Sequence, residues 1–433
     1  MADLNNPFSS FGQAVEYLYS RLPFFQRQGA SAYKPDLTNT LALLQVLGNP
    51  YREIKCIHVG GTNGKGSSSH LLASILQLQG YKTGLFTSPH LKSFTERIRV
   101  NGQEIKQVDV VSFVNRCYET IESLSPSFFE VTTAMALDYF RIMEVDIAVI
   151  EVGLGGRLDS TNVITPLVSL ITNIGHDHLD LLGPTLKDVA GEKAGIIKNG
   201  VPVVISERQT DLEQVFINTA AECNSTLTFA SDEVEVSLAD EEGFRNIRYG
   251  LKHLRVKPDL RGDYQTKNLA GVIKVTELLN NQGFAISDEA IVGGISQCTA
   301  ITGLKGRWQQ IGENPKVICD TGHNPEGIAQ IVQQLRHSKY KQLRWVFGMV
   351  GDKPPDPVLA LLPVDANYYF CRAGSQRSMD AAALAAHAAR YGLKSVVIPN
   401  VNEALAQARS EADPKDLIIV GGSTYVVAEV KGL

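Results

Sequence analysis

The feature that most constrains the fold of this chain is a glycine-rich stretch, HVGGTNGKGSSSH, at residues 58–70. An apolar run, IKCIHVG (54–60), leads into it, and an amphipathic run, SSHLLASILQLQG (68–80), follows it and ends at a glycine. These patterns predict a buried strand and a helix, respectively. A strand that feeds a helix through a short loop is the repeating unit of a parallel sheet covered by helices. The chain is therefore expected to have an α/β fold.

The glycine-rich loop also predicts a binding site for nucleotide phosphates. Its glycines permit backbone conformations that point successive N–H groups inward. The N-terminus of the following helix adds partial positive charge, and Lys65 adds a full charge. The three glycines are Gly61, Gly64 and Gly66.

The spacing of this loop departs from the common phosphate-loop pattern of Gly, four residues, Gly-Lys and then Ser or Thr. Aligned on Lys65, the pattern places Val59 where the first glycine is expected and Gly66 where the hydroxyl is expected. The hydroxyl for a magnesium ion is then supplied by Ser67 or by Ser68. The alternative is a tight strand-to-helix turn with a solvated lysine, but the strand before the loop and the helix after it favour the phosphate loop.

The rest of the chain alternates short β-branched runs with longer amphipathic ones, which is typical of helices around a mostly parallel sheet. A chain of 433 residues exceeds what one hydrophobic core usually supports, so two domains are expected. We predict a first domain, with a phosphate loop and a parallel sheet, over residues 1–299, a linker at 300–306, and a smaller Rossmann-like α/β domain over 307–433. Alternation within 226–260 predicts a small antiparallel side sheet on the first domain. Further strands of the first domain are expected within 81–88, 145–153 and 166–175. The second domain is expected to have strand-like runs at PKVICDTGHNPEG, KQLRWVFGMVGD, ANYYFCRAG, LKSVVIPN and KDLIIVGGSTYVVAEV, separated by helical runs that include MDAAALAAHAARYG.

Charge and cysteine content exclude several classes of protein. With 41 basic and 46 acidic residues the formal net charge is -5, which gives no general attraction to nucleic acid. The six cysteines are scattered singly, without the close pairs of a zinc site or the density of a disulfide-stabilised secreted domain. No targeting segment and no run of membrane-spanning length is found. We therefore expect a soluble cytoplasmic protein that binds neither nucleic acid nor membrane.

A carboxylate for a magnesium ion is expected at Glu151, which ends the apolar run DIAVIEVG. An unpaired charge there would be costly unless it met a cation, and magnesium prefers oxygen ligands. A salt bridge to Arg157 or Lys193 is the alternative. Just past the next predicted strand, His176 or His178 is a further candidate, although a single loop histidine is more often solvated or hydrogen-bonded.

Motifs along nearly the whole chain resemble the folylpolyglutamate synthase/dihydrofolate synthase family, a branch of the ATP-dependent amide ligases that includes the Mur ligases. The glycine after the loop lysine distinguishes this folate branch from the cell-wall Mur ligases, so Gly66 before Ser67 matches the folate form. The matching stretches are GTNGKGSS (61–68), TSPHLKSFTERIRVNG (87–102), EVGLGGRLDSTN (151–162), DHLDLLG (177–183), GEKAGIIK (191–198), GRW (306–308), DTGHNPEG (320–327) and GGSTYVVAEV (421–430).

The resemblance implies roles for individual residues. The loop Gly61, Thr62, Asn63, Gly64, Lys65, Gly66 and Ser67, with Asn268, Arg307 and Asp320, is expected to bind ATP. One or two Mg²⁺ ions are expected on Ser67, Ser88, Glu151, His178 and Lys193. A pterin or pteroate pocket is expected at Phe129, Glu130, Val131, Thr132, Leu158, Asp159 and Ser160, and a glutamate cleft at His323, Asn324 and Ser423.

Lys193 also matches a lysine that is carbamylated in related enzymes and helps to hold a second metal. Only a neutral amine attacks carbon dioxide, and burial lowers the pKa of a lysine, so carbamylation requires a buried position. An ordinary salt bridge to Glu192 or Asp188 is the alternative. We favour the modified lysine.

The implied reaction is phosphorylation of a carboxylate by ATP, followed by attack of the amino group of L-glutamate on the acyl phosphate. Lys65, Glu151, Lys193 and His323 are the expected catalytic residues. The substrate is expected to be dihydropteroate, reduced folates or both, and the enzyme a monomer. Two alternatives are a Mur-type ligase acting on a cell-wall nucleotide precursor and a nucleotide-dependent switch that makes no amide. The segment GMVGDKPPDP (348–357) departs from the family pattern by two prolines, so substrate contacts there are not assigned.

Overall fold

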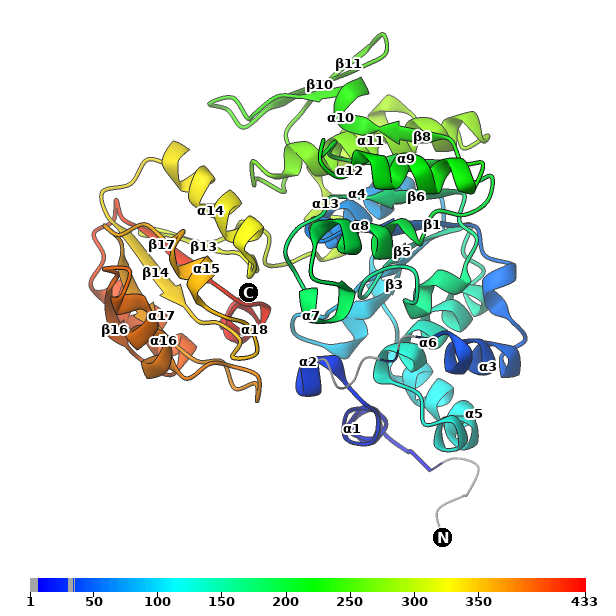
Figure 1. Ribbon diagram of the computed structural model, residues 1–433, viewed down its shortest axis with the longest axis horizontal. Helices are drawn as coiled ribbons and strands as arrows, with labels where there is room; N and C mark the ends of the chain where they lie inside the picture. Colours follow the sequence, from blue (N-terminus) through cyan, green and yellow to red (C-terminus); the bar gives the residue numbers. More distant parts are fainter. Residues whose placement is uncertain (1–6, 30–33, 35) are drawn as a thin grey trace. The chain divides into compact units, whose positions relative to one another are not determined.

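The computed structural model describes residues 7–29, 34 and 36–433 of the chain (Figure 1). The chain forms two compact units and passes between them more than once. The first unit runs to Asp259 and resumes over Gln265–Gly303, and the second comprises Leu260–Tyr264 and Leu304–Leu433. Among the described residues no helix is long and apolar enough to cross a membrane.

An eight-stranded sheet forms the centre of the first unit, in the order β4-β3-β2-β5-β1-β6-β7-β8. The strands from β2 to β8 in this order are parallel, and β3 and β4 add an antiparallel edge. The central strands are buried along their whole length because helices cover both faces of a parallel sheet. The strands are β1 (Cys56–Gly60), β2 (Thr83–Phe86), β3 (Ile98–Val100), β4 (Gln103–Glu104), β5 (Ile147–Glu151), β6 (Val168–Ile171), β7 (Val203–Ile205) and β8 (Leu227–Phe229).

Helix α4 (Lys65–Leu78) begins directly after the glycine-rich loop and is almost entirely buried. It contacts α11 (Gln265–Asn281), α12 (Asp288–Ser296) and α13 (Cys298–Thr302), which the chain adds after its excursion into the second unit. The remaining helices of the first unit are α1 (Phe11–Arg21), α2 (Phe25–Gln28), α3 (Thr38–Val46), α5 (Gln107–Leu124), α6 (Phe128–Ile142), α7 (Leu179–Leu182), α8 (Leu186–Ala194), α9 (Glu213–Glu222) and α10 (Ala230–Glu233).

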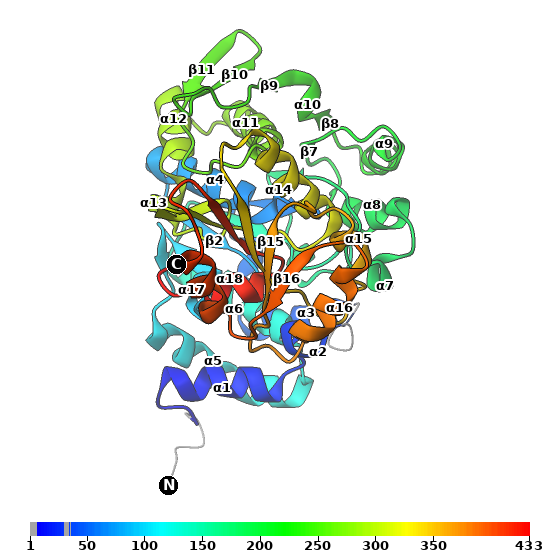
Figure 2. The same ribbon diagram turned by 90° about the vertical axis from the view of Figure 1, so that its left-hand side faces the viewer.

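A three-stranded antiparallel side sheet lies beside α11 and α12, in the order β11-β10-β9 (Figure 2). It comprises β9 (Val234–Val236), β10 (Arg245–Tyr249) and β11 (Lys252–Val256), which confirms the predicted side sheet for most of 226–260. The beginning of that segment was assigned incorrectly. Leu227–Phe229 is the edge strand β8 of the main sheet, where it pairs in parallel with β7.

The second unit has a six-stranded sheet in the order β12-β13-β17-β14-β15-β16, with β12 antiparallel and the others parallel. Alternate residues of a strand face opposite sides of the sheet. Trp345 and Phe347 of β14 therefore face the same side, where they share one core with α14, α15 and α16. Helix α17 contacts β14, β15 and β17, and α18 contacts β17. Helices thus flank a parallel sheet, as predicted for a Rossmann-like unit. The elements are β12 (Gln309–Glu313), β13 (Lys316–Cys319), α14 (Pro325–His337), β14 (Leu343–Phe347), α15 (Asp356–Leu359), β15 (Asn367–Phe370), α16 (Ala381–Ala389), β16 (Lys394–Val397), α17 (Val401–Ser410), β17 (Leu417–Gly421) and α18 (Thr424–Glu429).

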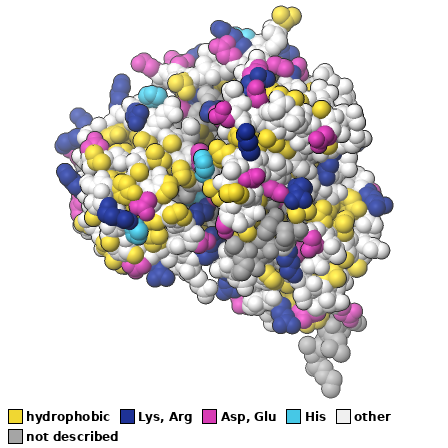
Figure 3. All heavy atoms as spheres, viewed as in Figure 1, with side chains coloured by type: hydrophobic (Ala, Val, Ile, Leu, Met, Phe, Trp, Pro, Cys, Tyr) yellow, Lys and Arg dark blue, Asp and Glu magenta, His cyan; other side chains and the backbone are white. Residues whose placement is uncertain are grey.

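The structure confirms most of the predicted strands and helices of both units, with ends shifted by a few residues. The second half of the last predicted strand-like run was wrong: β17 ends at Gly421, and the β-branched stretch after it is the helix α18, which Ser423 caps. Around the predicted linker, the structure adds regular elements that the sequence did not indicate. Residues 300–302 lie in α13, and Gln309–Glu313 form the antiparallel strand β12. On the face shown in Figure 3, basic and acidic side chains are mixed.

Candidate active site

The loop between β1 and α4 requires glycine at two positions. Gly61 has a φ of 133° and Gly64 a φ of 89°, a region that residues with a side chain rarely adopt. A Cβ added at Gly61 would lie 1.9 Å from Thr172 Oγ1, and one at Gly64 would lie 2.2 Å from Asn268 Oδ1. The loop is therefore held tightly against β6 and α11, and it brings Asn268, predicted to contact ATP, beside Gly64.

Two of the predicted loop residues are anchored within the protein. The backbone N–H of Thr62 donates to the Asn173 carbonyl at 2.8 Å, and the N–H of Asn63 donates to Asn173 Oδ1 at 2.9 Å. These N–H groups therefore hold the loop to the segment just after β6. The sequence had suggested that successive N–H groups of the loop point inward together, and these two do not. The first turn of α4 starts at Lys65 and provides N–H groups without intrahelical partners, which suit an anion.

Two lysine ammonium groups meet at one carbonyl of this loop. Lys65 Nζ donates to the Gly61 carbonyl at 2.9 Å and to that of Thr62 at 3.1 Å, and Lys193 Nζ donates to the Gly61 carbonyl at 3.0 Å. Lys193 comes from α8 and is only 5% exposed. Burial lowers the pKa of Lys193 to about 7 and the charge of Lys65 adds to the effect, against the opposite influence of nearby carboxylates. The site thus concentrates positive charge and contains one amine that is partly neutral near pH 7.

Ser67 is buried in the first turn of α4 and is held by a residue that the sequence analysis missed. Gln265 Nε2 donates to Ser67 Oγ at 3.2 Å, and Asn268 Nδ2 donates to Gln265 Oε1 at 2.7 Å. The first turn of α11 therefore orients both Ser67 and Asn268. No local sequence pattern indicates this role, because the contact with Ser67 spans 198 residues.

The predicted metal ligands Glu151 and Ser88 lie together at the C-terminal end of the sheet. Glu151 ends β5 beside Val59 of β1, and its Oε2 accepts the backbone N–H of Ser88 at 3.1 Å. His178 adopts a φ of 55°, lies 3.6 Å from an Asp177 oxygen through its Nε2, and packs edge-on against the Phe25 ring. The structure pairs Glu151 with the Ser88 backbone and pairs Lys193 with a carbonyl.

Within the part of the chain that the structure describes, no three or more His, Cys, Asp and Glu side chains gather as a metal site. This arrangement still fits magnesium, which is usually bound by one or two carboxylates while water and substrate phosphates complete its coordination. The hydroxyl of Ser67 and the carboxylate of Glu151 are hard oxygen donors of the required kind, and both side chains are buried.

The predicted pterin pocket lies around the first turns of α6. The Phe129 ring faces Gly153, where an added Cβ would lie 2.4 Å from Phe129 Cζ. Glu130 closes a capping box with Ser127, and its Oε1 is buried without a partner among the described residues. Val131 and Thr132 are fully buried, and Thr132 Oγ1 donates to the Phe129 carbonyl. Among these four residues, only Phe129 has a partly exposed side chain.

The second part of this predicted pocket is the loop after β5. Asp159 is 3% exposed and accepts hydrogen bonds from the Leu154 N–H at 2.8 Å and the Thr161 N–H at 2.9 Å. Burial raises the pKa of Asp159, and these hydrogen bonds oppose the rise. Ser160 is buried and Leu158 is half-buried. Asp159 therefore organises the loop.

In the second unit, Asp320 is the centre of a buried hydrogen-bond cluster directly after β13. It accepts the Tyr264 hydroxyl at 2.7 Å, the Trp308 N–H at 2.8 Å and the Gly322 N–H at 2.8 Å. Burial raises the pKa of Asp320, while these partners and the charge of Arg307 oppose the rise. Asp320 thus ties three separate segments of the second unit together, and Tyr264 was missed by the sequence analysis.

The predicted glutamate-binding residues lie at the C-terminal ends of neighbouring strands, β13 and β17. His323 Nδ1 donates to the Thr321 carbonyl at 3.0 Å. Asn324 caps α14 by accepting the Gly327 N–H, and Ser423 caps α18 by accepting the Val426 N–H. Ligands of parallel α/β sheets bind at such strand ends, which makes this edge the candidate cleft of the second unit.

The phosphate loop and the doubly wound second unit are typical of a nucleotide-dependent α/β enzyme, and two family models give its class as the Mur ligases. Residues 59–276 match the Mur ligase middle domain, and residues 306–424 match the glutamate ligase domain of Mur ligases. Curated relatives narrow this class. The dihydrofolate synthase/folylpolyglutamate synthase of Bacillus subtilis (strain 168) is 32% identical over 438 residues, which cover 98% of this chain and 99% of the relative.

Solved structures agree with this assignment. Escherichia coli FolC in complex with DHPP and ADP superposes with a TM-score of 0.84 at 29% identity, covering 97% of this chain and 96% of that one. A bifunctional folylpolyglutamate synthase/dihydrofolate synthase with Mn, AMPPNP and L-glutamate bound has a TM-score of 0.84 at 29% identity, with 99% and 98% coverage. The chain belongs to the dihydrofolate synthase/folylpolyglutamate synthase family. It is an ATP-dependent glutamate ligase that forms a carbon–nitrogen bond, which confirms the predicted class of enzyme.

Proposed function

We propose that this enzyme adds L-glutamate both to dihydropteroate and to reduced folates, and that the residues described above in each unit bind its substrates and its metal. The observation that carries the proposal is that Lys65 and Lys193 both donate to the Gly61 carbonyl. Gly61 follows β1, and the Ser88–Glu151 pair lies at the ends of β2 and β5 of the same sheet. This edge of the first unit concentrates positive charge and hard oxygen donors, as transfer of a phosphoryl group to an anionic carboxylate requires.

In the first step, a carboxylate oxygen of the pteroate or folate attacks the γ-phosphorus of ATP, the bond to the β-phosphate oxygen breaks, and ADP leaves. Two anions must approach each other, so the surrounding positive charge lowers the barrier. Lys65 and the N-terminus of α4 supply that charge on the phosphates. Asn268 and Gln265 hold the loop and Ser67 in place.

Bound magnesium would neutralise phosphate charge, and Ser67, Ser88 and Glu151 are the residues that would hold it. The burial of Glu151 at 4% exposed supports this role, because a buried carboxylate is stabilised by a nearby cation. His178 completes the proposed set.

In the second step, the amino nitrogen of L-glutamate attacks the acyl carbon, and inorganic phosphate leaves with the bonding electron pair. The attacking nitrogen must be neutral and must lose a further proton as the amide forms. His323 is the proposed acceptor of that proton. Because its Nδ1 donates to a carbonyl, the neutral ring carries its lone pair on Nε2. Asn324 and Ser423 are proposed to orient the glutamate.

Carbamylation of Lys193 is part of the proposal. The buried amine, with a pKa of about 7, is sufficiently neutral at pH 7 to 8 to add carbon dioxide. Protein equilibrated with ¹³C-bicarbonate should give a carbamate carbon signal in its NMR spectrum. Lys193→Met should remove that signal, while Lys187→Met, which changes an exposed lysine of the same helix, should retain it. A spectrum identical in the two variants would argue against modification at Lys193.

The test of the function is phosphate release by the purified full chain. We expect ADP and phosphate only when ATP, L-glutamate and either dihydropteroate or tetrahydrofolate monoglutamate are all present. Lys65→Ala should lower this rate by about three orders of magnitude or more and leave the fold intact, because the lysine contributes charge in the transition state. Turnover that needs no pterin, or that needs a uridine-nucleotide peptide, would instead favour the Mur-type alternative.

We further infer a monomer working in a reducing compartment. All six cysteines are free, and five of them are buried, which supports the absence of disulfides. Sedimentation at micromolar concentration checks the oligomeric state, and a mass close to twice 47.2 kDa would contradict it.

A further inference from the structure

Three buried polar side chains form a hydrogen-bond chain beneath the loop that follows β5. His58 Nε2 lies 2.8 Å from Thr161 Oγ1, and Thr161 Oγ1 lies 2.5 Å from Asp159 Oδ1. His58 and Thr161 are both 0% exposed, and Asp159 is 3% exposed. These hydrogen bonds therefore connect β1, the strand that leads into the phosphate loop, with the loop expected to border the pterin.

The hydrogen bonds of this chain run in one direction. Asp159 already accepts two backbone N–H groups, so its oxygens act as acceptors and the Thr161 hydroxyl donates to it. The Thr161 oxygen then accepts the N–H of His58 Nε2. Burial and the nearby charge of Lys198 lower the pKa of His58 to about 3, so the ring is neutral and has one N–H to give.

The position of His58 is costly for a residue that only fills space. Its Nδ1 is buried and has no hydrogen-bond partner within the described residues. Burying a polar atom without a partner is unfavourable, whereas an apolar side chain, such as those of Ile57 and Val59 beside it in β1, has no such cost. The contribution that distinguishes histidine here is its single N–H, which fixes the Thr161 hydroxyl.

The loop that this chain holds determines how closely the backbone approaches Phe129. Asp159 binds the Leu154 N–H, one residue after Gly153, and Gly153 is the residue against which the Phe129 ring lies. The other end of the loop is anchored by Asn162 Nδ2, which donates to the Gly195 carbonyl at 3.0 Å. A shift of Asp159 would therefore move the backbone that faces the ring.

We propose that His58 and Thr161 are positioning residues of the pteroate pocket, which set the Gly153–Ser160 loop against Phe129 by fixing Asp159. The proposal rests on the function proposed above, since it takes the ligand beside Phe129 to be a pterin. Neither residue touches the ligand, so their effect is on the affinity for one substrate.

The experiment compares Thr161→Val, which removes the hydroxyl at nearly constant volume, with Thr161→Ser, which retains it. Thr161→Val should raise the KM for dihydropteroate by about tenfold, the loss of one buried hydrogen bond. The KM values for ATP and L-glutamate should change by less than about twofold, and Thr161→Ser should restore the wild-type value. His58→Gln retains an N–H near Nε2 and should be milder than His58→Leu.

The outcomes distinguish the positioning role of His58 and Thr161 from the assignment of the pocket at Phe129. Equal rises in all three KM values, or no difference between the Val and Ser variants, would overturn the positioning role. Phe129→Ala is the control for the pocket itself: if it leaves the KM for dihydropteroate unchanged, the pocket assignment is wrong. If Phe129→Ala raises that KM and Thr161→Val does not, the pocket stands and the hydrogen-bond chain has no positioning role. If a variant at position 161 fails to fold, His58→Leu and His58→Gln give the same comparison, since only His58→Gln retains an N–H.

Discussion

At the scale of single residues, the candidate active site depends on backbone conformations that only glycine adopts easily. Gly64 combines a positive φ with an approach of 2.2 Å between an added Cβ and Asn268 Oδ1. Gly80, two residues past α4, also has a positive φ of 98°, but an added Cβ there would meet nothing within 4 Å. Comparing Gly64 with Gly80 therefore separates the cost of backbone strain from the cost of displacing Asn268, the side chain proposed to bind ATP.

Gly64→Ala should therefore raise the KM for ATP by at least about tenfold, because the new methyl group displaces Asn268 and distorts the loop. Gly80→Ala should lower stability by about 1 kcal/mol, the cost of the left-handed conformation, and leave the KM for ATP unchanged. Steady-state kinetics and thermal unfolding of the two variants check this expectation. Equal kinetic effects in both would show that the space around Gly64 has no bearing on nucleotide binding.

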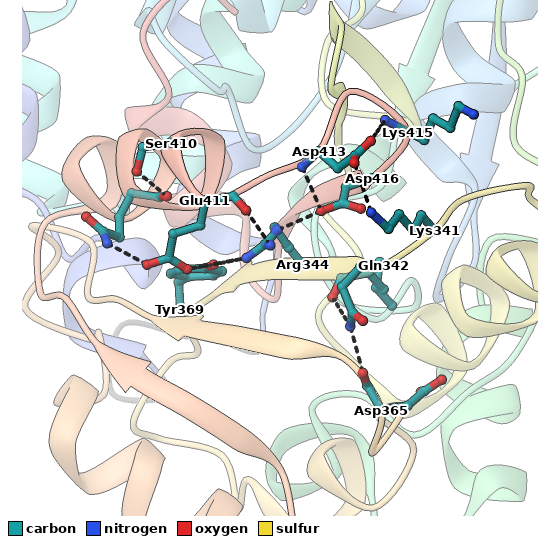
Figure 4. Close-up of polar contacts among 12 residues, drawn as sticks. Lys341, Gln342, Arg344, Asp365, Tyr369, Ser410, Glu411, Asp413, Lys415 and Asp416 are labelled. Atoms are coloured by element: carbon teal, nitrogen blue, oxygen red, sulfur yellow. Dashed lines mark hydrogen bonds and ion pairs between the residues drawn. The ribbon is translucent and has the colours of Figure 1, made fainter.

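At the scale of strands and helices, a partly buried charged network stabilises the second unit. Arg344 on β14 donates through Nε to Asp416 at 3.0 Å, through Nη1 to the Tyr369 hydroxyl at 2.6 Å, and through Nη2 to the Glu411 carbonyl at 2.5 Å (Figure 4). The side chains of Arg344 and Asp416 are 12% and 2% exposed. The network joins β14 and β15 to the end of α17 and the start of β17.

Arg344→Met should destabilise the second unit by about 3 kcal/mol, because it leaves the Asp416 carboxylate buried without its cation. The matched control is Lys341→Met, whose partner Asp413 is at the surface and whose own side chain is 65% exposed, so about 0–1 kcal/mol is expected. Hydrogen exchange of the β14 and β17 amides measures both values. Similar exchange rates in the two variants would contradict the structural role of Arg344.

The sequence predicted elements well where burial gives a strong pattern. CIHVG and IAVIE are buried at every position, and both were found. The antiparallel strand QQIGE is half-exposed and carries no apolar alternation, so it was missed. Leu227–Phe229 was assigned to the wrong sheet for a different reason: its alternation continues into the side-sheet strands that follow, and alternation does not indicate which sheet a strand joins.

The site was predictable to the extent that its residues lie in motifs of consecutive letters. The phosphate loop and Glu151 could be identified in this way, and Glu151 does lie beside β1. Gln265, Tyr264 and the pair His58 and Thr161 could not, because each acts through a polar contact with a residue far away in the sequence. Such contacts leave no periodic pattern, and only the fold brings their partners together.

At the scale of the whole molecule, the chain crosses between its two units three times: after Asp259, after Tyr264 and after Gly303. The short segment Leu260–Tyr264 is bound to the second unit through the hydrogen bond between the Tyr264 hydroxyl and Asp320, and through the Asp263 N–H, which donates to Gln334 Oε1 at 2.9 Å. Five residues from the middle of the chain thus complete a unit formed otherwise by its C-terminal part.

Tyr264→Phe should lower the local stability around β13 and α14 by about 1–3 kcal/mol, because Asp320 is buried and loses one of its donors. Tyr391→Phe is the matched control: its hydroxyl also donates to an aspartate, Asp356, but at a partly exposed site, so a smaller loss is expected. Amide exchange in α14 distinguishes the two. Protection equal to that of the wild type in Tyr264→Phe would mean that the segment is not needed to hold Asp320.

The position of Leu260–Tyr264 also limits how this chain can be recombined with its relatives. A crossover at residue 303 would give a chimera whose C-terminal unit comes from one parent and whose Tyr264 comes from the other. Asp320 and the residue at position 264 would then have been selected in different backgrounds. Viable hybrids should therefore take Leu260–Tyr264 and Leu304–Leu433 from the same parent, so exchange of the second unit requires two linked exchanges and not one.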